Sequence, residues 1–147
     1  MEISLQGRSA LITGGSEGLG KGMAIRFAAS GANVAIVARR PEILGSAKAE
    51  VDAAGTGKVV ALPCDLLDPA ATVQAFKDAE QALGKIDILV NNAGTSRAKP
   101  FESVTDEEWY EDLELKLMAA VRLCRTALPA MKQRKWGRII NVLNIGA

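Results

Sequence analysis

The sequence predicts an α/β fold built on a doubly wound parallel sheet. Short apolar runs bounded by turn residues alternate with longer segments of helical period, which is the order that a parallel sheet with crossover helices requires. The 147 residues are 48% hydrophobic, which is enough for one domain with a substantial core. We therefore expect residues 1–147 to form a single domain.

Five apolar runs are predicted to form the strands of this sheet. Each is short and is followed by a glycine, a proline or a polar residue. In chain order they are Arg8–Thr13, Asn33–Ala38, Lys58–Leu62, Ile86–Val90 and Arg138–Leu143. The last run lies four residues from the end of the chain, and parallel strands normally have both faces covered. We therefore expect a domain that is truncated after its fifth strand and is covered by a C-terminal half or a partner chain.

Three helices are predicted between the first four strands. Pro41 and Pro69 suit the first helical position, where their missing N–H has no helical partner, and Asp68 suits the capping position before Pro69. Gly31 and Gly84 suit the left-handed position just beyond a helix end. The expected helices are Gly18–Ser30, Pro41–Ala54 and Pro69–Leu83.

A long fourth helix is predicted to begin at Asp106. Thr105 and Glu108 have the spacing of a capping box, and Lys132, Arg134 and Lys135 suit the negative end of the helix. We expect Pro129 to kink it. Its apolar positions recur every three or four residues, at Trp109, Leu113, Leu117, Val121, Cys124, Leu128 and Met131. Trp109, Tyr110 and Trp136 are expected to serve packing.

Composition argues against several classes of function. The 18 basic and 17 acidic residues leave a net charge of +1, so no overall field attracts nucleic acid or an acidic membrane. There is no histidine, and Cys64 and Cys124 form no CxxC pair, so no metal site is expected. No leader or apolar stretch of about 18 residues is found, and we expect a cytoplasmic protein.

A glycine-rich turn links the first strand to the first helix and predicts an anion site. Glycines at 14, 18 and 20 let the backbone approach a pyrophosphate at the positive end of the helix. The turn consists of Thr13, Gly14, Gly15, Ser16, Glu17, Gly18, Leu19 and Gly20. A tight turn without a ligand is the alternative. The positions of the strand and the helix favour a dinucleotide.

The end of the second strand predicts which dinucleotide binds. An acidic residue there binds the ribose hydroxyls of NAD, whereas a basic one accepts the 2′-phosphate of NADP. Ala38 carries no carboxylate, and Arg39 and Arg40 follow it, so NADP is favoured over NAD. Glu17 argues mildly against this by placing a negative charge nearby.

A second motif, Asn91-Asn92-Ala93-Gly94, follows the fourth strand. Together with Thr13-Gly14-x-x-x-Gly18-x-Gly20, it resembles the short-chain dehydrogenase/reductase family. The resemblance covers about the first 60% of a usual member. It implies a Rossmann-like fold, an NADP(H)-dependent oxidoreductase acting on a small carbonyl or alcohol substrate, and a homodimer or homotetramer formed through the long helix.

The resemblance also implies further cofactor contacts. Asp65, with Leu66 beside it, stands where family members hydrogen-bond the adenine amino group. Asn91, Asn92, Ala93 and Gly94 stand where members line the ribose and the nicotinamide. For both groups, a turn with no ligand is the alternative.

The family's catalytic positions are altered in this chain. The usual Asn lies seven residues beyond the tryptophan of the long helix, and from Trp109 this position holds Lys116. The usual Ser corresponds to Asn144, and the Tyr-x-x-x-Lys pair would lie beyond Ala147. Asn144 is a candidate hydrogen-bond donor to a substrate carbonyl, and Lys116 a candidate for a proton relay or a solvent-facing residue. The alternative function is nucleotide binding without dehydrogenase turnover, in regulation or in another reaction.

Overall fold

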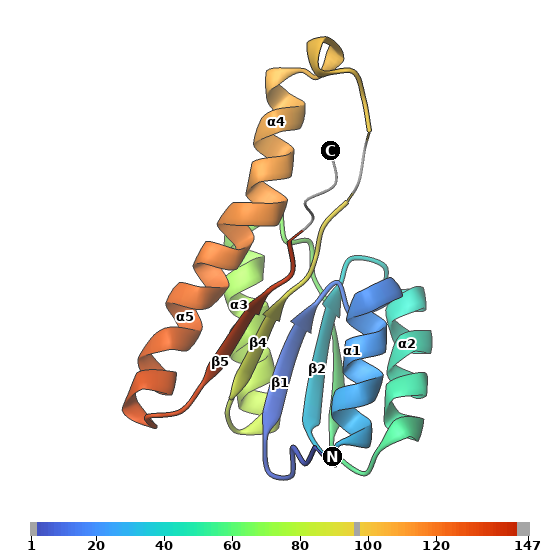
Figure 1. Cartoon of the computed structure of the whole chain (residues 1–147), viewed down its shortest axis with the longest axis vertical. Coiled ribbons are helices and arrows are strands. Elements are labelled where there is room, and N and C mark those ends of the chain that lie inside the picture. Colours follow the sequence, from blue (N-terminus) through green and yellow to red (C-terminus); the bar gives the residue numbers. More distant parts are fainter. Residues whose placement is uncertain (1–2, 96–97, 144–147) are drawn as a thin grey trace.

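The computed structural model describes residues 3–95 and 98–143, and in this part the chain forms a five-stranded parallel sheet with helices on both faces (Figure 1). The strand order is β3-β2-β1-β4-β5. The strands are β1 (Ser9–Thr13), β2 (Asn33–Ala38), β3 (Val59–Pro63), β4 (Ile88–Asn91) and β5 (Arg138–Asn141). The predicted doubly wound α/β fold is confirmed.

The winding of the sheet reverses between β1 and β4. From β1 the chain builds outward to β2 and β3, and it then returns to the other side of β1 to place β4 and β5. Leu11 of β1 pairs in register with Ala35 of β2 on one side and with Leu89 of β4 on the other. Loops leaving such a switch point diverge toward opposite faces and leave a crevice at the carboxyl ends of the strands.

Alternate strand residues supply two separate cores. Helices α1 (Gly18–Ala29) and α2 (Pro41–Ala54) pack on the face that contains Ala10 and Ile12. Helices α3 (Pro69–Leu83) and α5 (Ala119–Gln133) cover the face of Leu11, where Phe76 and Leu123 are buried. Each large side chain buried in this way contributes about 1.5–3 kcal/mol.

Most of the predicted helix ends are present. The Asp68 carboxylate accepts hydrogen bonds from the backbone N–H groups of Ala70 at 2.9 Å and Ala71 at 3.0 Å, which caps α3. Gly84 ends α3 with φ +83°. Thr105 and Glu108 form the expected capping box at α4 (Asp106–Leu113). Several strand bounds differ from expectation by one residue, and two differ by two residues: β4 begins two residues later and β5 ends two residues earlier than predicted.

The single long helix predicted from Asp106 is interrupted. A π-helical segment, η2 (Glu114–Met118), separates α4 from α5. The helix continues through Pro129 to Gln133, so the irregularity that the structure records lies at η2, about three turns before the proline. A π-helical segment contains one extra residue per turn and is found frequently at functional sites.

The apolar positions of this helix lie mostly on its outer face. Trp109, Leu113, Leu117 and Leu128 are exposed, and the buried face is formed by Ala119, Leu123, Ala127 and Met131. Figure 1 shows why side chains of α4 are exposed: this helix extends beyond the carboxyl ends of the strands, so the sheet does not cover it. The periodicity therefore predicts the helix correctly but does not identify the face that packs on the sheet. Tyr110, expected to serve packing, is 71% exposed.

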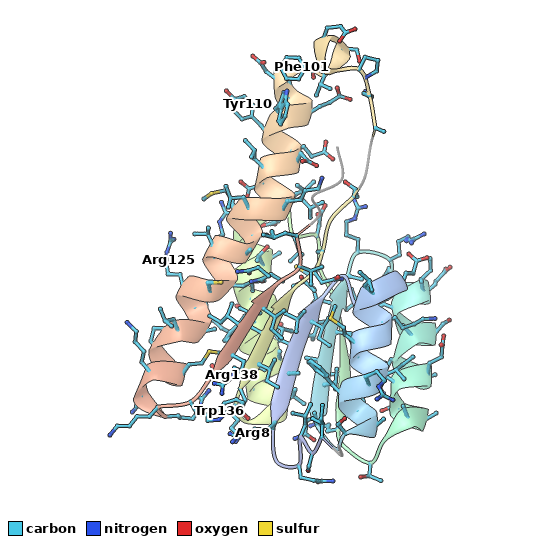
Figure 2. All side chains as sticks on the ribbon, viewed as in Figure 1. Arg8, Phe101, Tyr110, Arg125, Trp136 and Arg138 are labelled. Carbon is cyan, nitrogen blue, oxygen red and sulfur yellow. The ribbon has the colours of Figure 1, made fainter. Side chains whose placement is uncertain are left out.

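The amino ends of the strands are joined by charged and aromatic contacts. The Asp87 side chain is 1% exposed, accepts a hydrogen bond from the backbone N–H of Ser9 at 3.1 Å and pairs with Lys85 at 3.1 Å. Nearby, the guanidinium carbons of Arg8 and Arg138 lie 3.6 Å and 4.9 Å from the ring centre of Trp136 (Figure 2). These contacts serve packing, at the edge of the sheet opposite to the crevice.

Candidate functional site

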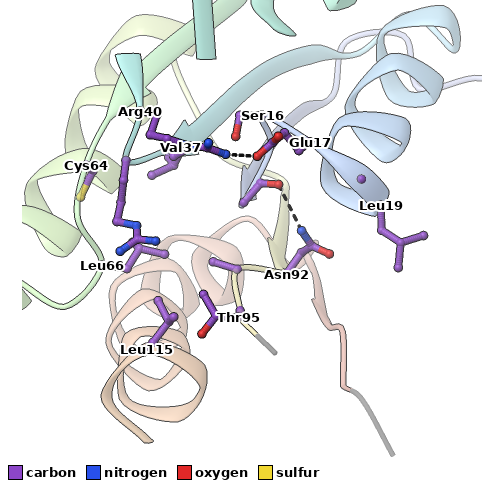
Figure 3. A pocket seen from close by; sticks show the side chains of 16 residues that line it. Ser16, Glu17, Leu19, Val37, Arg40, Cys64, Leu66, Asn92, Thr95 and Leu115 are labelled. Atoms are coloured by element: carbon purple, nitrogen blue, oxygen red, sulfur yellow. Dashed lines mark hydrogen bonds and ion pairs between the residues drawn. The ribbon is translucent and has the colours of Figure 1, made fainter. Parts of the chain in front are cut away.

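A cleft of about 430 Å³ lies at the carboxyl ends of β1, β2 and β4 (Figure 3). Most of the predicted cofactor residues line it. These are Gly14, Ser16, Glu17, Gly18, Leu19, Arg39, Arg40, Leu66, Asn92, Ala93 and Gly94. Five further residues line the cleft that were not predicted as cofactor contacts: Val37, Ala38, Cys64, Thr95 and Leu115. Of these, Leu115 had no local signal, because it lies in the unexpected π-helical segment.

The glycines of the turn serve different purposes. Gly14 and Gly18 have φ of +65° and +53°, in the left-handed region that favours glycine. A Cβ on Gly20 would lie 2.1 Å from the carbonyl oxygen of Gly14, so Gly20 is required by the turn itself. A Cβ on Gly18 would have no atom within 4 Å. Gly18 therefore leaves its backbone accessible from the cleft.

The amino end of α1 has no side-chain cap. Its N-cap residue is Glu17, whose side chain makes no capping hydrogen bond, and the first turn contains no acidic residue. The first N–H groups of a helix lack partners within the helix and carry a partial positive charge. Since Gly18 and Leu19 line the cleft, this positive end borders it. The arrangement suits a phosphate or another anion.

Thr13 and Asn92 hold the two sequence motifs together. Thr13 is 2% exposed, and its hydroxyl oxygen accepts hydrogen bonds from the backbone N–H groups of Asn92 and Ala93, both at 3.0 Å. The Asn92 side-chain amide donates to the backbone oxygens of Thr13 at 3.1 Å and Gly14 at 3.3 Å. Thr13 does not line the cleft, so its side chain positions the turns that do.

Charged side chains occupy the β2 end of the cleft. Arg40 forms an ion pair with Glu17, which Figure 3 shows across the mouth of the cleft. Both side chains are well exposed, and exposed pairs of this kind contribute only about 0–1 kcal/mol. Arg39 also lines the cleft, and the described residues include no ion-pair partner for it. The arginines can therefore bind an incoming anion with little loss of free energy from the ion pair that Arg40 gives up.

Besides Thr13 and Gly20, two more residues predicted to contact a cofactor, Asp65 and Asn91, do not line the cleft. Asp65 accepts a hydrogen bond from the backbone N–H of Leu67 at 3.0 Å, as a turn residue does. The Asn91 side-chain amide donates to the side-chain oxygen of Asn141 on β5 at 2.8 Å and lies 3.4 Å from the Cys124 sulfur. In this structure both residues serve the chain's own packing.

Cys64 adds a thiol to the wall of the cleft. Burial raises the pKa of this thiol, and the negative charges of Asp65 and Asp68 raise it further. The thiol form is therefore favoured over the reactive thiolate at neutral pH. Cys64 is a small wall residue and no nucleophile.

Of the two candidate catalytic residues, the structure places Lys116. Its Cε lies 3.7 Å from the position that a Cβ on Gly94 would take, so its stem rests against the loop after β4. Its ammonium pairs with Asp112 at 2.8 Å. Asn144 lies outside the described residues.

The comparisons with known proteins agree with this geometry. The family model for short chain dehydrogenase matches residues 8–146. The chain belongs to the short-chain dehydrogenase family. Members of this family are oxidoreductases that bind nicotinamide cofactors and act on small molecules, and they are typically oligomeric.

Several members are similar over almost the whole chain. The D-beta-hydroxybutyrate dehydrogenase of Cupriavidus necator is 40% identical over 139 residues, which cover 94% of this chain and 53% of that protein. The structure of L-sorbose reductase from Gluconobacter frateurii, complexed with NADPH and L-sorbose, has a TM-score of 0.89 and 35% identity, covering 95% of this chain and 53% of the other. A metagenomic short-chain oxidoreductase in complex with NADP has a TM-score of 0.90 and 34% identity, covering 97% and 64%.

The chain spans about half the length of the curated relatives that it matches. Within the described residues, no three His, Cys, Asp or Glu side chains are grouped so that they could hold a metal ion. Over the same residues, no helix is both long enough and apolar enough to cross a membrane.

Proposed function

We propose that this chain is the NADP(H)-binding part, incomplete at its C-terminus, of an oxidoreductase that interconverts a carbonyl compound and an alcohol. The uncapped amino end of α1 carries the proposal, because it borders a cleft at the switch point of the sheet. Gly18 leaves room for close approach of a pyrophosphate. When bound, the nicotinamide supplies or accepts the hydride.

The lining of the cleft supports one direction for the dinucleotide in this proposal. The pyrophosphate would bind the first N–H groups of α1, and the adenosine ribose would lie at the β2 end, beside Arg39 and Arg40. The nicotinamide would then reach the opposite end, which is lined by Gly94, Thr95 and Leu115. The chain's own residues thus bind and orient the cofactor.

The 2′-phosphate of NADP matches the charges at the β2 end. Arginine grips phosphate through paired, charge-assisted hydrogen bonds, and Ala38 offers no carboxylate to the ribose hydroxyls of NAD. Two of the similar structures contain NADPH or NADP, which supports the same preference. Glu17 opposes it, because its carboxylate already pairs with Arg40.

Calorimetric titration of the full-length protein with NADPH and NADH tests this proposal. We expect saturable binding of both and tighter binding of NADPH. Arg39→Gln is expected to weaken NADPH binding about ten- to a hundredfold and to leave NADH binding unchanged, because it removes a charge-assisted hydrogen bond of about 1.5–3 kcal/mol. Absence of saturable binding would overturn the proposal. Binding without turnover on any carbonyl or alcohol would instead support a nucleotide-binding protein.

Glu17→Gln provides the matching gain-of-affinity variant. It removes the charge that competes for Arg40, so NADPH is expected to bind about two- to fivefold tighter. Asp52→Asn is the control, since it breaks an exposed pair with Lys48 on α2, away from the cleft. If Glu17→Gln and Asp52→Asn raised the affinity for NADPH equally, the gain would come from overall charge and not from the release of Arg40.

We further propose that the long helix pairs with its copy in a second subunit. Its exposed apolar side chains include Trp109, Leu113, Leu117 and Leu128. The charged residues of α4 are all acidic, and those of α5 are all basic, at Arg122, Arg125 and Lys132. Two antiparallel copies would therefore place the acidic half of one helix against the basic half of the other. A C2 dimer pairs surfaces in this way.

Leu117→Glu is expected to weaken the dimer about a hundredfold. Each copy loses a leucine that the dimer would bury, and each places a charge at the interface. Light scattering of the full-length protein over a concentration series measures the effect. Ala53→Glu, at an exposed position of α2, should leave the dimer intact. A stable monomer of the unaltered protein would contradict the proposed pairing.

A further inference from the structure

Lys116 places a positive charge beside the part of the cleft that is lined by Gly94. Its Cγ and Cε lie 3.8 Å and 3.7 Å from the position that a Cβ on Gly94 would take, so the stem of the side chain rests on the loop after β4. Gly94 and Thr95 line this end of the cleft. The ammonium is one bond beyond Cε.

The π-helical segment brings two successive residues to this place. Leu115 lines the cleft, and the stem of Lys116 contacts Gly94 beside it. Leu115 and Lys116 are neighbours in this segment, so their side chains reach adjacent parts of the same wall. The irregular segment η2 thus combines an apolar wall and a cation at one position.

The charge of Lys116 is available to a ligand. Its one ion-pair partner within the described residues is Asp112, at 2.8 Å, and the two side chains are 44% and 42% exposed. An exposed pair at this helical spacing contributes only about 0.3–0.5 kcal/mol. The ammonium has three N–H donors, so it can keep its ion pair with Asp112 and also donate a hydrogen bond to a second anion.

Apart from Asp112, which pairs with Lys116, the Gly94 end of the cleft has no acidic group among the described residues that line it. Among the described residues that line the cleft, Glu17 is the one carboxylate, and it pairs with Arg40 at the β2 end. A negatively charged ligand at the Gly94 end would therefore be attracted by Lys116, and the carboxylate beside it among the described residues, Asp112, is already paired with that ammonium.

We propose that Lys116 binds an anionic group of the second substrate, and that this substrate is an oxo or hydroxy carboxylate. This inference rests on the proposed function, in which the nicotinamide reaches the end of the cleft at Gly94. When the reacting carbonyl of the substrate lies beside the nicotinamide, a carboxylate a few bonds away in the same molecule comes within reach of Lys116. A compact ammonium suits a small carboxylate as a point charge. Lys116 is thus a substrate-binding residue, and it sets specificity for acids over neutral ketones.

Binding without turnover tests the inference. The full-length protein, saturated with NADP⁺, is titrated by calorimetry with 3-oxobutanoate and 4-oxopentanoate and with the methyl ester of each. Both partners are then oxidised, so no hydride transfer occurs. At least one acid is expected to bind about tenfold or more tightly than its ester. No preference for an acid in either pair would overturn the inference. Tighter binding of dihydroxyacetone phosphate than of both acids would also overturn it.

Variants locate the preference at Lys116. Lys116→Met is expected to remove the difference between acid and ester, and Lys116→Arg to retain it. Lys77→Met changes the net charge equally at an exposed position of α3 and should have no effect. A preference that persists in Lys116→Met would overturn the inference. Cofactor titration of each variant separates the two proposals: loss of NADP⁺ binding contradicts the proposed function, whereas intact cofactor binding without acid preference contradicts only the role of Lys116.

Discussion

Replacement of Gly20 with alanine is expected to destabilise the fold by about 3 kcal/mol and to abolish dinucleotide binding. The added Cβ would lie 2.1 Å from the carbonyl oxygen of Gly14 and 2.6 Å from the side-chain nitrogen of Asn92. The nearer atom belongs to the backbone, so a rotation of a flexible side chain cannot relieve the clash. The turn must open, and the amino end of α1 moves with it.

Urea unfolding measures the first effect, and calorimetry with NADPH measures the second. Gly22→Ala is the matched control in the same helix, because a Cβ at Gly22 has no atom within 4 Å. That variant should be more stable than the unaltered protein by about 0.5–1 kcal/mol, since alanine has the higher helix propensity. Similar behaviour of the two variants would contradict the close approach of Gly20 to Gly14.

Thr13→Val is expected to cost about 2–4 kcal/mol of unfolding free energy. Valine keeps the shape of threonine but removes the oxygen that accepts hydrogen bonds from the backbone N–H groups of Asn92 and Ala93. Each buried N–H left without a partner costs about 1–3 kcal/mol. Because the same bonds hold the loop after β4 against the glycine turn, NADPH binding should weaken as well.

Thr13→Ser is the control for this prediction, since it keeps the hydroxyl oxygen and loses only a methyl group. We expect it to lie close to the unaltered protein in urea unfolding and in NADPH affinity. If Thr13→Val were as stable as Thr13→Ser, the hydroxyl would not be the link between β1 and β4.

Local sequence signals are sufficient for much of this protein. The apolar runs predict all five strands of the described sheet, and Asp68, Gly84 and the Thr105–Glu108 pair predict helix ends that the structure confirms. These features depend on residues close together in the chain, whose conformational preferences act locally. The spacing of the glycines likewise predicts a cleft-forming turn before any packing is known.

Long-range packing decides the rest. The outward position of Leu113 and Leu117, the link from Thr13 to Asn92 and the contact of Lys116 with Gly94 each depend on segments that are distant in sequence. A periodic pattern shows that a helix has an apolar side, but not which surface covers that side. The glycine turn and the arginines are therefore recognisable from sequence, whereas the contact of Lys116 with Gly94 beside the cleft depends on how the π-helical segment lies against the loop after β4.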